Sequence, residues 1–333
     1  MENENQPLVS IGVPVFNGEK GLAVALDSLI AQDYPNLEII ISDNASTDAT
    51  SKICEEYVGK DGRIKYNRLE ENIGSALNFN QVFERSSGKY FMWAAHDDQH
   101  NKSFVTECVE KMIRFPNAVA CHAQTEMYLR KEERMEMICL THLDSFEGVT
   151  KLVERYRETR KHVPIDIIYG LFCSSAMRRT QMLKKTLSCD SVFIQELSIY
   201  GEFIQVRKTL FNYFAKEKWN TIDQDCLAIL GKKKSWWLLP FVVVFYNNWK
   251  RVACASIPLS TKFRLWGVLI EHETGQLALK ILIKVAGRLC PGRWKERLGC
   301  AIYWRWMHSP NMSVGVEEIF LERIIKPRLG WWR

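Results

Sequence analysis

Residues 9–18 read VSIGVPVFNG, and residues 37–46 read LEIIISDNAS. Each stretch is a short apolar run that ends abruptly in polar residues, which is typical of a buried strand that opens into a loop. After the first stretch, Leu22, Leu26 and Leu29 recur at helical spacing. Strands that alternate with helices through short connections predict a parallel sheet joined by right-handed crossovers.

The same alternation continues outward from these two strands. We expect strands at 63–66 and 90–95 and helices at 46–58, 75–85 and 101–115. Beyond Cys121 the pattern is mixed, and it predicts short strands near Ala120 and Met127 and helices at 147–159 and 190–200. The sequence therefore predicts an α/β fold, a sheet flanked by helices.

Polar clusters follow three of the expected strands. They are Phe16-Asn17-Gly18, Asp43-Asn44-Ala45-Ser46 and His96-Asp97-Asp98. Ligands of open α/β sheets bind outside the carboxyl ends of the strands. A purely structural protein has little reason to place acidic and amide groups at three such ends, so we expect a binding site there.

Asp43 comes one residue after a buried strand, where a carboxylate needs a hydrogen-bond donor. The ring N–H of a uracil or another pyrimidine is one such donor. The alternative is a structural role at the start of a helix, where Asp, Asn and Ser are preferred capping residues. We favour ligand binding for Asp43 and helix capping for Ser46.

Asp97 and Asp98 are adjacent carboxylates that repel each other unless a cation or water separates them. Mg²⁺ or Mn²⁺ takes oxygen ligands from one or two carboxylates and completes its shell with substrate phosphates. Such an ion neutralises charge that develops on a leaving phosphate. Alone, the pair reads equally well as a solvated turn. Together with Asp43 in one sheet, it predicts a divalent metal site.

The last third of the chain differs from the rest in charge and in tryptophan content. Residues 231–333 hold 18 Lys and Arg against six Asp and Glu, and nine of the 11 tryptophans. We therefore expect two units, a catalytic domain at 1–230 and a basic, mostly helical extension at 231–333. The extension suits contact with an anionic membrane surface, and the alternative is a helical cap with a solvated basic face.

Several classes of protein are disfavoured. The apolar run at 236–246 is shorter than the roughly 20 residues of a membrane span. The ten cysteines show no zinc-binding spacing, and no secretory leader is visible. We therefore expect a cytoplasmic protein that makes peripheral contact with the inner face of a membrane. Apolar residues of the basic tail recur at helical spacing without any nucleic-acid motif, so we expect no nucleic-acid partner.

The motifs also resemble a known family. Pro14 to Gly18, Ser42 to Asp48, Asn72-Ile73-Gly74 and Gly88-Lys89-Tyr90 leading to His96-Asp97-Asp98 are similar, in order and spacing, to the family 2 glycosyltransferases with the GT-A fold. The resemblance covers roughly residues 7–215. It implies an inverting enzyme that transfers a sugar from a nucleotide-sugar, most commonly a UDP-sugar, to a glycan or lipid-linked acceptor.

The resemblance also implies roles for individual residues. The donor nucleotide would be held by Pro14, Phe16, Asn17, Asp43, Asn72 and His96, with Asp43 reading the base. Asp97, with Asp98 beside it, would bind Mn²⁺ or Mg²⁺. Asp190, followed by Gly201, matches the position of the general base, and Glu196 competes for that role. A base there would take the proton of the attacking acceptor hydroxyl.

Three positions depart from the family pattern. The first Asp of the family's DxD element is Ala95, a frequently aromatic position is His100, and the Glu before the base is Cys189. These departures keep an alternative open, a degenerate glycosyltransferase that acts as a non-catalytic binding or scaffold subunit. A nucleotidyltransferase or a dinucleotide oxidoreductase would need a glycine-rich loop after the first strand, and that loop is missing.

Overall fold

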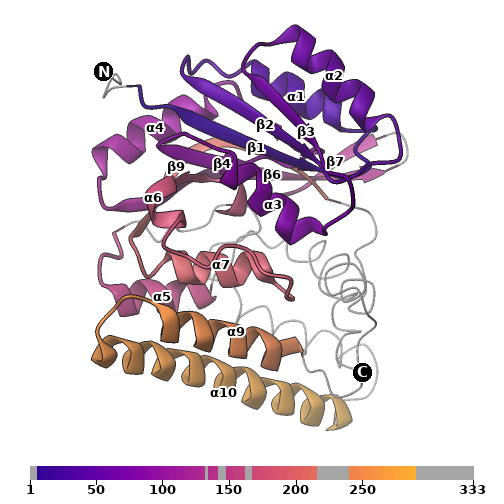
Figure 1. The fold of residues 1–333 in the computed structure, drawn as a ribbon. Helices are drawn as coiled ribbons and strands as arrows, with labels where there is room; N and C mark the ends of the chain where they lie inside the picture. Colours follow the sequence, from indigo (N-terminus) through magenta and orange to yellow (C-terminus); the bar gives the residue numbers. More distant parts are fainter. Residues whose placement is uncertain (1–5, 132–133, 142–147, 162–166, 216–239, 290–333) are drawn as a thin grey trace.

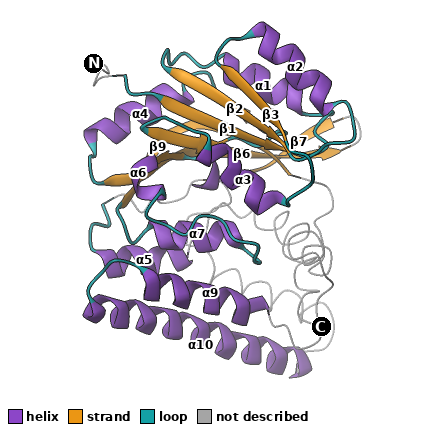
Figure 2. Cartoon of the chain, in the orientation of Figure 1, coloured by secondary structure: helices purple, strands orange, loops and turns teal. Residues whose placement is uncertain are grey.

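A computed structural model describes residues 6–131, 134–141, 148–161, 167–215 and 240–289 (Figure 1). A mixed sheet with flanking helices forms one part of the chain, and a helical layer lies below it (Figure 2). The predicted α/β class with a helical C-terminal region is confirmed. The expected boundary at residue 230 and the tail from 290 to 333 lie outside the described residues.

The first half of the sheet follows the predicted alternation. Strands β1 (Val9–Val15), β2 (Leu37–Asp43), β3 (Ile64–Arg68) and β4 (Tyr90–Trp93) are parallel, in the order β3-β2-β1-β4. The connecting helices are α1 (Leu22–Ile30), α2 (Thr50–Lys60), α3 (Ser75–Glu84) and α4 (Phe104–Arg114). Because β1 and β2 are buried along their whole length, their sequences read as continuous apolar runs.

The second half of the sheet is mixed and was predicted poorly. Strand β8 (Leu171–Cys173) pairs antiparallel with β4 and with β6 (Ala118–Lys131), and β9 (Glu202–Ala215) runs parallel to β6. Strands β7 (Arg134–Thr141) and β5 (Gln99–His100) pair antiparallel with β6 and β9. The expectation of short strands near Ala120 and Met127 is wrong, because both residues lie in the 14-residue β6.

The second half of the chain adds helices in two places. Helices η1 (Ile167–Tyr169), α6 (Ser174–Met177) and α7 (Cys189–Leu197) pack against the sheet. Helices α5 (Leu152–Lys161), α9 (Pro240–Cys254) and α10 (Leu259–Leu289) form a separate hydrophobic layer. One cluster of buried side chains, among them Tyr156, Val252 and Leu265, joins α5, α9 and α10. Trp249 and Trp266 stack beside it, with ring centroids 4.7 Å apart. These two tryptophans therefore serve packing within the helical layer.

Among the residues that the structure describes, no helix is both long and apolar enough to cross a membrane. Helix α10 has the length, with 31 residues, but charged residues such as Lys262, Arg264 and Glu271 interrupt its apolar character.

Glu38 ties the first strands of the sheet together at their amino-terminal side. Its Oε1 accepts hydrogen bonds from the Ser10 hydroxyl at 2.6 Å and from the Ser87 backbone N–H and hydroxyl, both at 2.8 Å. Its Oε2 pairs with Lys65 at 2.6 Å. Burial opposes the charge of this carboxylate, but these donors outweigh it and hold the pKa of Glu38 at about 2. The ionised form is therefore the one that the fold requires.

We predict that Glu38→Gln destabilises the fold at neutral pH but not near pH 2. A carboxyl group with a lowered pKa in the folded state contributes stability above its ordinary pKa, and that contribution is lost as pH falls toward 2. Chemical denaturation from pH 7 to pH 2 should show the two proteins converging in free energy of unfolding. A difference that does not change with pH would contradict this account.

Candidate active site

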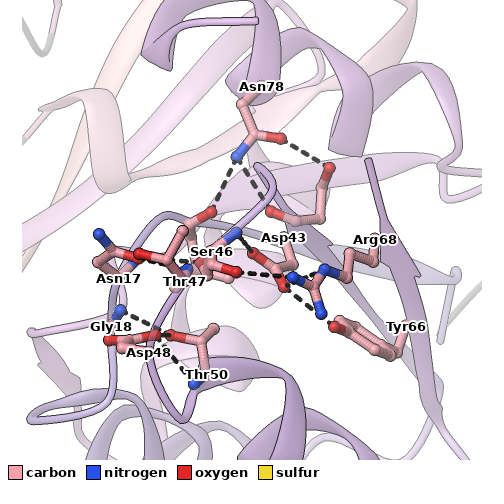
Figure 3. Close-up of polar contacts among 12 residues, drawn as sticks. Asn17, Gly18, Asp43, Ser46, Thr47, Asp48, Thr50, Tyr66, Arg68 and Asn78 are labelled. Atoms are coloured by element: carbon pink, nitrogen blue, oxygen red, sulfur yellow. Dashed lines mark hydrogen bonds and ion pairs between the residues drawn. The ribbon is translucent and has the colours of Figure 1, made fainter. Parts of the chain in front are cut away.

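The loops that follow β1 and β2 are joined by hydrogen bonds around Asn17 (Figure 3). The backbone N–H of Asn17 donates to Ser46 Oγ at 2.9 Å, and Asn17 Oδ1 accepts from the Thr47 N–H at 2.9 Å. Next to it, the Gly18 N–H donates to Thr50 Oγ1 at 2.8 Å. The expectation that Ser46 caps the following helix is wrong, because α2 begins only at Thr50 and Ser46 is used between the loops.

Asp43 lies at the end of β2, and its carboxylate is fully buried. Its Oδ1 accepts from the Ser46 N–H at 2.9 Å, and its Oδ2 accepts from the Tyr66 hydroxyl at 3.0 Å. Arg68 lies 3.7 Å from Oδ2 and also donates to the Ser46 carbonyl at 2.7 Å (Figure 3). Burial first, and then the Asp43 carboxylate, raise the pKa of Tyr66. Tyr66 is therefore a neutral hydrogen-bond donor to Asp43.

The other expected donor-binding residues surround this point. Pro14 lies in β1 opposite Ser42 of β2, and Phe16 follows β1 with 43% of its surface exposed. Asn72 accepts a hydrogen bond from Asn44 at 2.9 Å, which joins a third loop to the β2 end. The exposed ring of Phe16 next to the polar side chains at the end of β2 suits a flat nucleotide base.

Asn78 was missed by the sequence analysis. It lies in α3, is buried, accepts from the Ser42 hydroxyl at 2.6 Å and donates to the Ser42 carbonyl at 3.0 Å (Figure 3). Its only sequence signal is an amide within a helix whose neighbours Val82 and Phe83 face the core. Asn78 fixes α3 against the end of β2.

Gly18 brings the first loop against the third strand-end cluster. A Cβ atom at Gly18 would lie 2.6 Å from Val15 Cγ2 and 2.9 Å from His96 Cδ2. A Cβ at Gly21 would meet the His96 carbonyl at 3.0 Å and Asp97 Cα at 3.2 Å. Side chains at either position would push this cluster away, so the glycines allow His96 and Asp97 to lie beside the β1 loop.

Asp97 and Asp98 differ in their surroundings. Asp97 is half-buried, whereas Asp98 is 2% exposed and its Oδ1 accepts from the Phe214 N–H of β9 at 2.8 Å. Asp98 Oδ2 is buried without a hydrogen-bond partner. Burial raises the pKa of Asp98 well above its usual range; the Phe214 N–H opposes this rise, and the charge of Asp97 adds to it. A cation would relieve this unfavourable arrangement.

The hydroxyl of Tyr169 in η1 is affected by the charges of this pair and of Asp190. Burial raises the pKa of its hydroxyl well above the ordinary value, and the charges of Asp98, Asp97 and Asp190 add to the rise. All three carboxylates therefore act on one phenol, although they come from the loop after β4 and from α7. Asp190 is the second residue of α7 and is half-buried. A helix N-terminus favours a negatively charged side chain.

Glu196, the competing base, lies farther along α7 and is 3% exposed. It forms a buried ion pair with Arg251 of α9, and both of its oxygens accept from the Gln181 N–H, at 3.1 and 3.0 Å. Its hydrogen-bonding capacity is largely taken up by the fold.

Two of the departures from the family pattern have clear surroundings. His100 is buried between the rings of Phe104 and Phe211, with centroids 4.8 and 4.7 Å away, and burial lowers its pKa to about 3. It is a neutral core residue that packs between two aromatic rings. Burial raises the pKa of the Cys189 thiol to about 12, and the Asp190 charge contributes. Cys189 therefore adds no charge next to Asp190.

The family model described as "Glycosyl transferase family 2" matches residues 10–187, more than half of the chain. The chain belongs to glycosyltransferase family 2. The matched region contains Asp43, Asp97 and Asp98 and ends just before Asp190.

Relatives of this glycosyltransferase carry the same description. The putative teichuronic acid biosynthesis glycosyltransferase TuaG of Bacillus subtilis is 34% identical over 116 residues, 35% of this chain and 44% of the relative. An uncharacterized glycosyltransferase of Haemophilus influenzae is 26% identical over 243 residues, 68% of this chain and 95% of the relative. The match to the glycosyltransferase GlyA of Streptococcus pneumoniae covers 16% of that relative. This chain therefore spans less than two thirds of the length of TuaG and of GlyA.

Solved structures share the fold of this enzyme. S. aureus TarS 1–349 in complex with UDP-GlcNAc has a TM-score of 0.57 at 16% identity, over 97% of this chain and 92% of that one. The mannosyltransferase PcManGT from Pyrobaculum calidifontis, in complex with GDP-Man and Mn²⁺, has a TM-score of 0.51 at 14% identity, over 97% and 87%. These likenesses confirm the GT-A type of fold.

Proposed function

We propose that this glycosyltransferase transfers a sugar from a nucleotide-sugar, first of all a UDP-sugar, to an acceptor with inversion of the anomeric configuration. The observation that carries the proposal is that the hydrogen-bonded loops around Asp43 lie against the His96–Asp97 cluster, through the close contacts of Gly18 and Gly21. The charges of Asp97, Asp98 and Asp190 all add to the raised pKa of Tyr169, which supports placing Asp190 beside that cluster. A donor base, a diphosphate and an acceptor hydroxyl need three such regions side by side.

The donor nucleotide would lie over the loops after β1 and β2. Pro14, Phe16 and Asn17 would line its pocket, and Asp43 would accept the ring N–H of the base once the contacts that cover its carboxylate, from Ser46, Tyr66 and Arg68, open. Asn72 and His96 border the same region. The TarS structure with UDP-GlcNAc supports a UDP-sugar as the first choice. The PcManGT structure holds GDP-Man, which makes GDP-sugars, together with dTDP-sugars, the competing donors in a binding test.

The residues present fit a divalent metal. Among the described residues there is no group of three or more His, Cys, Asp or Glu side chains that could hold an ion by itself. Mg²⁺ or Mn²⁺ can instead be held by one or two carboxylates, with substrate phosphates completing the shell. Asp97 would bind the ion and Asp98, with its unpartnered oxygen, would support it. Mn²⁺ or Mg²⁺ there supplies positive charge to the leaving diphosphate.

Asp190 would act as the general base. Its half-buried carboxylate at the start of α7 can take the proton of the acceptor hydroxyl as that oxygen attacks the anomeric carbon. Direct attack by one acceptor, with the nucleotide leaving on the opposite side, inverts the configuration. Glu196 fits the role less well, because Arg251 and Gln181 already occupy its oxygens.

We predict that Asp97→Asn abolishes metal-dependent donor binding and transfer while the fold persists. The amide keeps the shape of the side chain but removes the charge that attracts a divalent cation. Donors from a panel of UDP-, dTDP- and GDP-sugars are ranked by thermal shift with Mn²⁺, and hydrolysis of the best one is then measured. Asp61→Asn, next to Arg63 before β3, serves as control. Full activity of Asp97→Asn, or activity unaffected by EDTA, would show that the metal assignment is wrong.

We predict that Asp190→Asn lowers the rate by about 10²–10⁴-fold, the usual contribution of general-base catalysis, while donor affinity barely changes. Steady-state rates and direct donor binding distinguish these two effects. A larger rate loss in a folded Glu196→Gln variant would transfer the base role to Glu196. If the wild-type protein binds the donor but shows neither transfer nor hydrolysis, the non-catalytic scaffold alternative is favoured.

The acceptor would be a glycan or a lipid-linked molecule presented at the cytoplasmic face of a membrane. Exposed apolar side chains on α10 recur at helical spacing, with Leu259 and Phe263 both 62% and Ile270 49% exposed. On α9, Tyr246 is also 62% exposed. Apolar and aromatic side chains suit the membrane interface, and each nearby Lys or Arg adds about 1 kcal/mol on an anionic leaflet. The division into units at 1–230 and 231–333 belongs to this proposal.

We predict that the full chain floats with anionic liposomes at low salt and is released as salt increases. Phe263→Ser combined with Ile270→Ser should weaken this binding, because it removes apolar area from the α10 stripe. Ile113→Ser combined with Phe115→Ser is the matched control, since these two side chains of the α4 region are 43% and 41% exposed. Equal binding of both double variants, or no flotation of the wild type, would leave the extension as a structural cap.

A further inference from the structure

The segment of residues 181–188 leads directly into the helix that carries Asp190. Two of its residues, Met182 with φ 53° and Ser188 with φ 51°, lie in the left-handed region of backbone space. Residues other than glycine adopt this conformation only where the surroundings enforce it. The position at which α7 begins therefore depends on contacts from outside the segment.

Arg251 of α9 supplies the first of these contacts. Its Nη1 pairs with Glu196 Oε2, and its Nη2 donates to the Met182 carbonyl at 2.7 Å. Glu196 accepts from the Gln181 N–H at the same time. Both charged side chains are 3% exposed, so the pair is shielded from water. One guanidinium thus links the start of the segment to the far end of α7.

Asn247, one turn earlier on α9, contacts the other end of the segment. Its Nδ2 donates to Thr186 Oγ1 at 3.0 Å. From the opposite side, Asn80 of α3 donates to the Leu183 carbonyl at 2.8 Å and accepts from the Leu183 N–H at 3.1 Å. The segment is therefore held between α3 and α9. In Figure 1, α7 lies between the sheet and α9.

We propose that Arg251 and Asn247 are positioning residues for Asp190, so that the C-terminal extension completes the active site by fixing the 181–188 segment. The inference rests on the proposed role of Asp190 as the base. Asp190 follows Ser188 by two residues, and a shift of the segment moves its carboxylate by a similar amount. A displacement of about 1 Å can lower a catalysed rate on the order of 100-fold.

The test is a double-mutant cycle between Arg251 and Asp190 in the full chain. Hydrolysis of the nucleotide-sugar that gives the largest thermal shift with Mn²⁺ is the readout. Arg251→Gln should lower kcat by about tenfold or more in the wild-type background and by less than about twofold in the Asp190→Asn background. The donor Kd, measured directly, should stay within about twofold in all four proteins, because Asn17 and Asp43 are fixed by hydrogen bonds among the loops after β1 and β2 and by Tyr66. Arg251→Lys keeps the charge but loses the planar guanidinium that can bind Glu196 and the Met182 carbonyl at the same time. Its rate should lie between those of Arg251→Gln and the wild type.

Asn247→Ala is the second variant, for the case that Arg251→Gln does not fold. It removes the Thr186 contact alone from the segment and should show the same dependence on Asp190, with a loss of about threefold or more. Arg157→Gln is the matched control, since Arg157 of α5 pairs with Glu271 of α10 at 3.1 Å on the surface and does not contact the segment. It should leave kcat unchanged in both backgrounds.

Equal losses in both backgrounds would show that Arg251 and Asn247 only stabilise the fold, and would overturn the inference. An unchanged rate in Arg251→Gln and Asn247→Ala would overturn it as well. If Asp190→Asn alone leaves the rate unchanged, the assignment of the base is wrong. A strong effect of Asp190→Asn without coupling to either α9 residue would contradict only the positioning role.

Discussion

Asn17 and the backbone of residues 46–47 hold each other in place, and the rest of the site is arranged around this contact. Asn17 has a φ of 52°, an unfavourable conformation for most side chains that asparagine tolerates. Its amide oxygen and its backbone N–H are both used between the two loops. Asn17 thereby places Gly18 close to the His96 ring, with no room for a side chain between them. The loop that contains Asp43's neighbours Ser46 and Thr47 is thereby linked to the cluster that contains Asp97, although 53 residues of chain lie between the two aspartates.

The sequence predicts those site residues that lie at the ends of parallel strands, and it does not predict those whose partners are set by packing between distant elements. Asp43 and the Asp97–Asp98 pair could be placed together because parallel strands bring their carboxyl ends to one edge of the sheet. Asn78, Tyr66 and Arg68 could not, because their partners are set by how α3 and β3 pack on β2. Their hydrogen bonds to Ser42, Asp43 and Ser46 leave no periodic pattern in the sequence.

The second half of the fold was harder to predict for a similar reason. Strands β6 and β9 contain register shifts, one of them between Ala123 and Gln124, and each shift interrupts the alternation of inward and outward side chains. Strand β9 therefore escaped prediction. Asp190 was selected only through the family resemblance, because a carboxylate in the first turn of a helix is common and its neighbours in space come from distant parts of the chain.

The helical layer has two faces with different consequences for the chemistry. The inner face of α9 and α10 packs on Tyr156 of α5 through Val252 and Leu265, and α9 also contacts the 181–188 segment. The outer face of the layer carries the exposed stripe of α10. Because close-packed interiors compress little, a surface bound at the stripe would be held in a defined position relative to α7, which carries Asp190. Both proposals for the extension therefore describe one arrangement, in which the same two helices present the acceptor and orient the group that activates it.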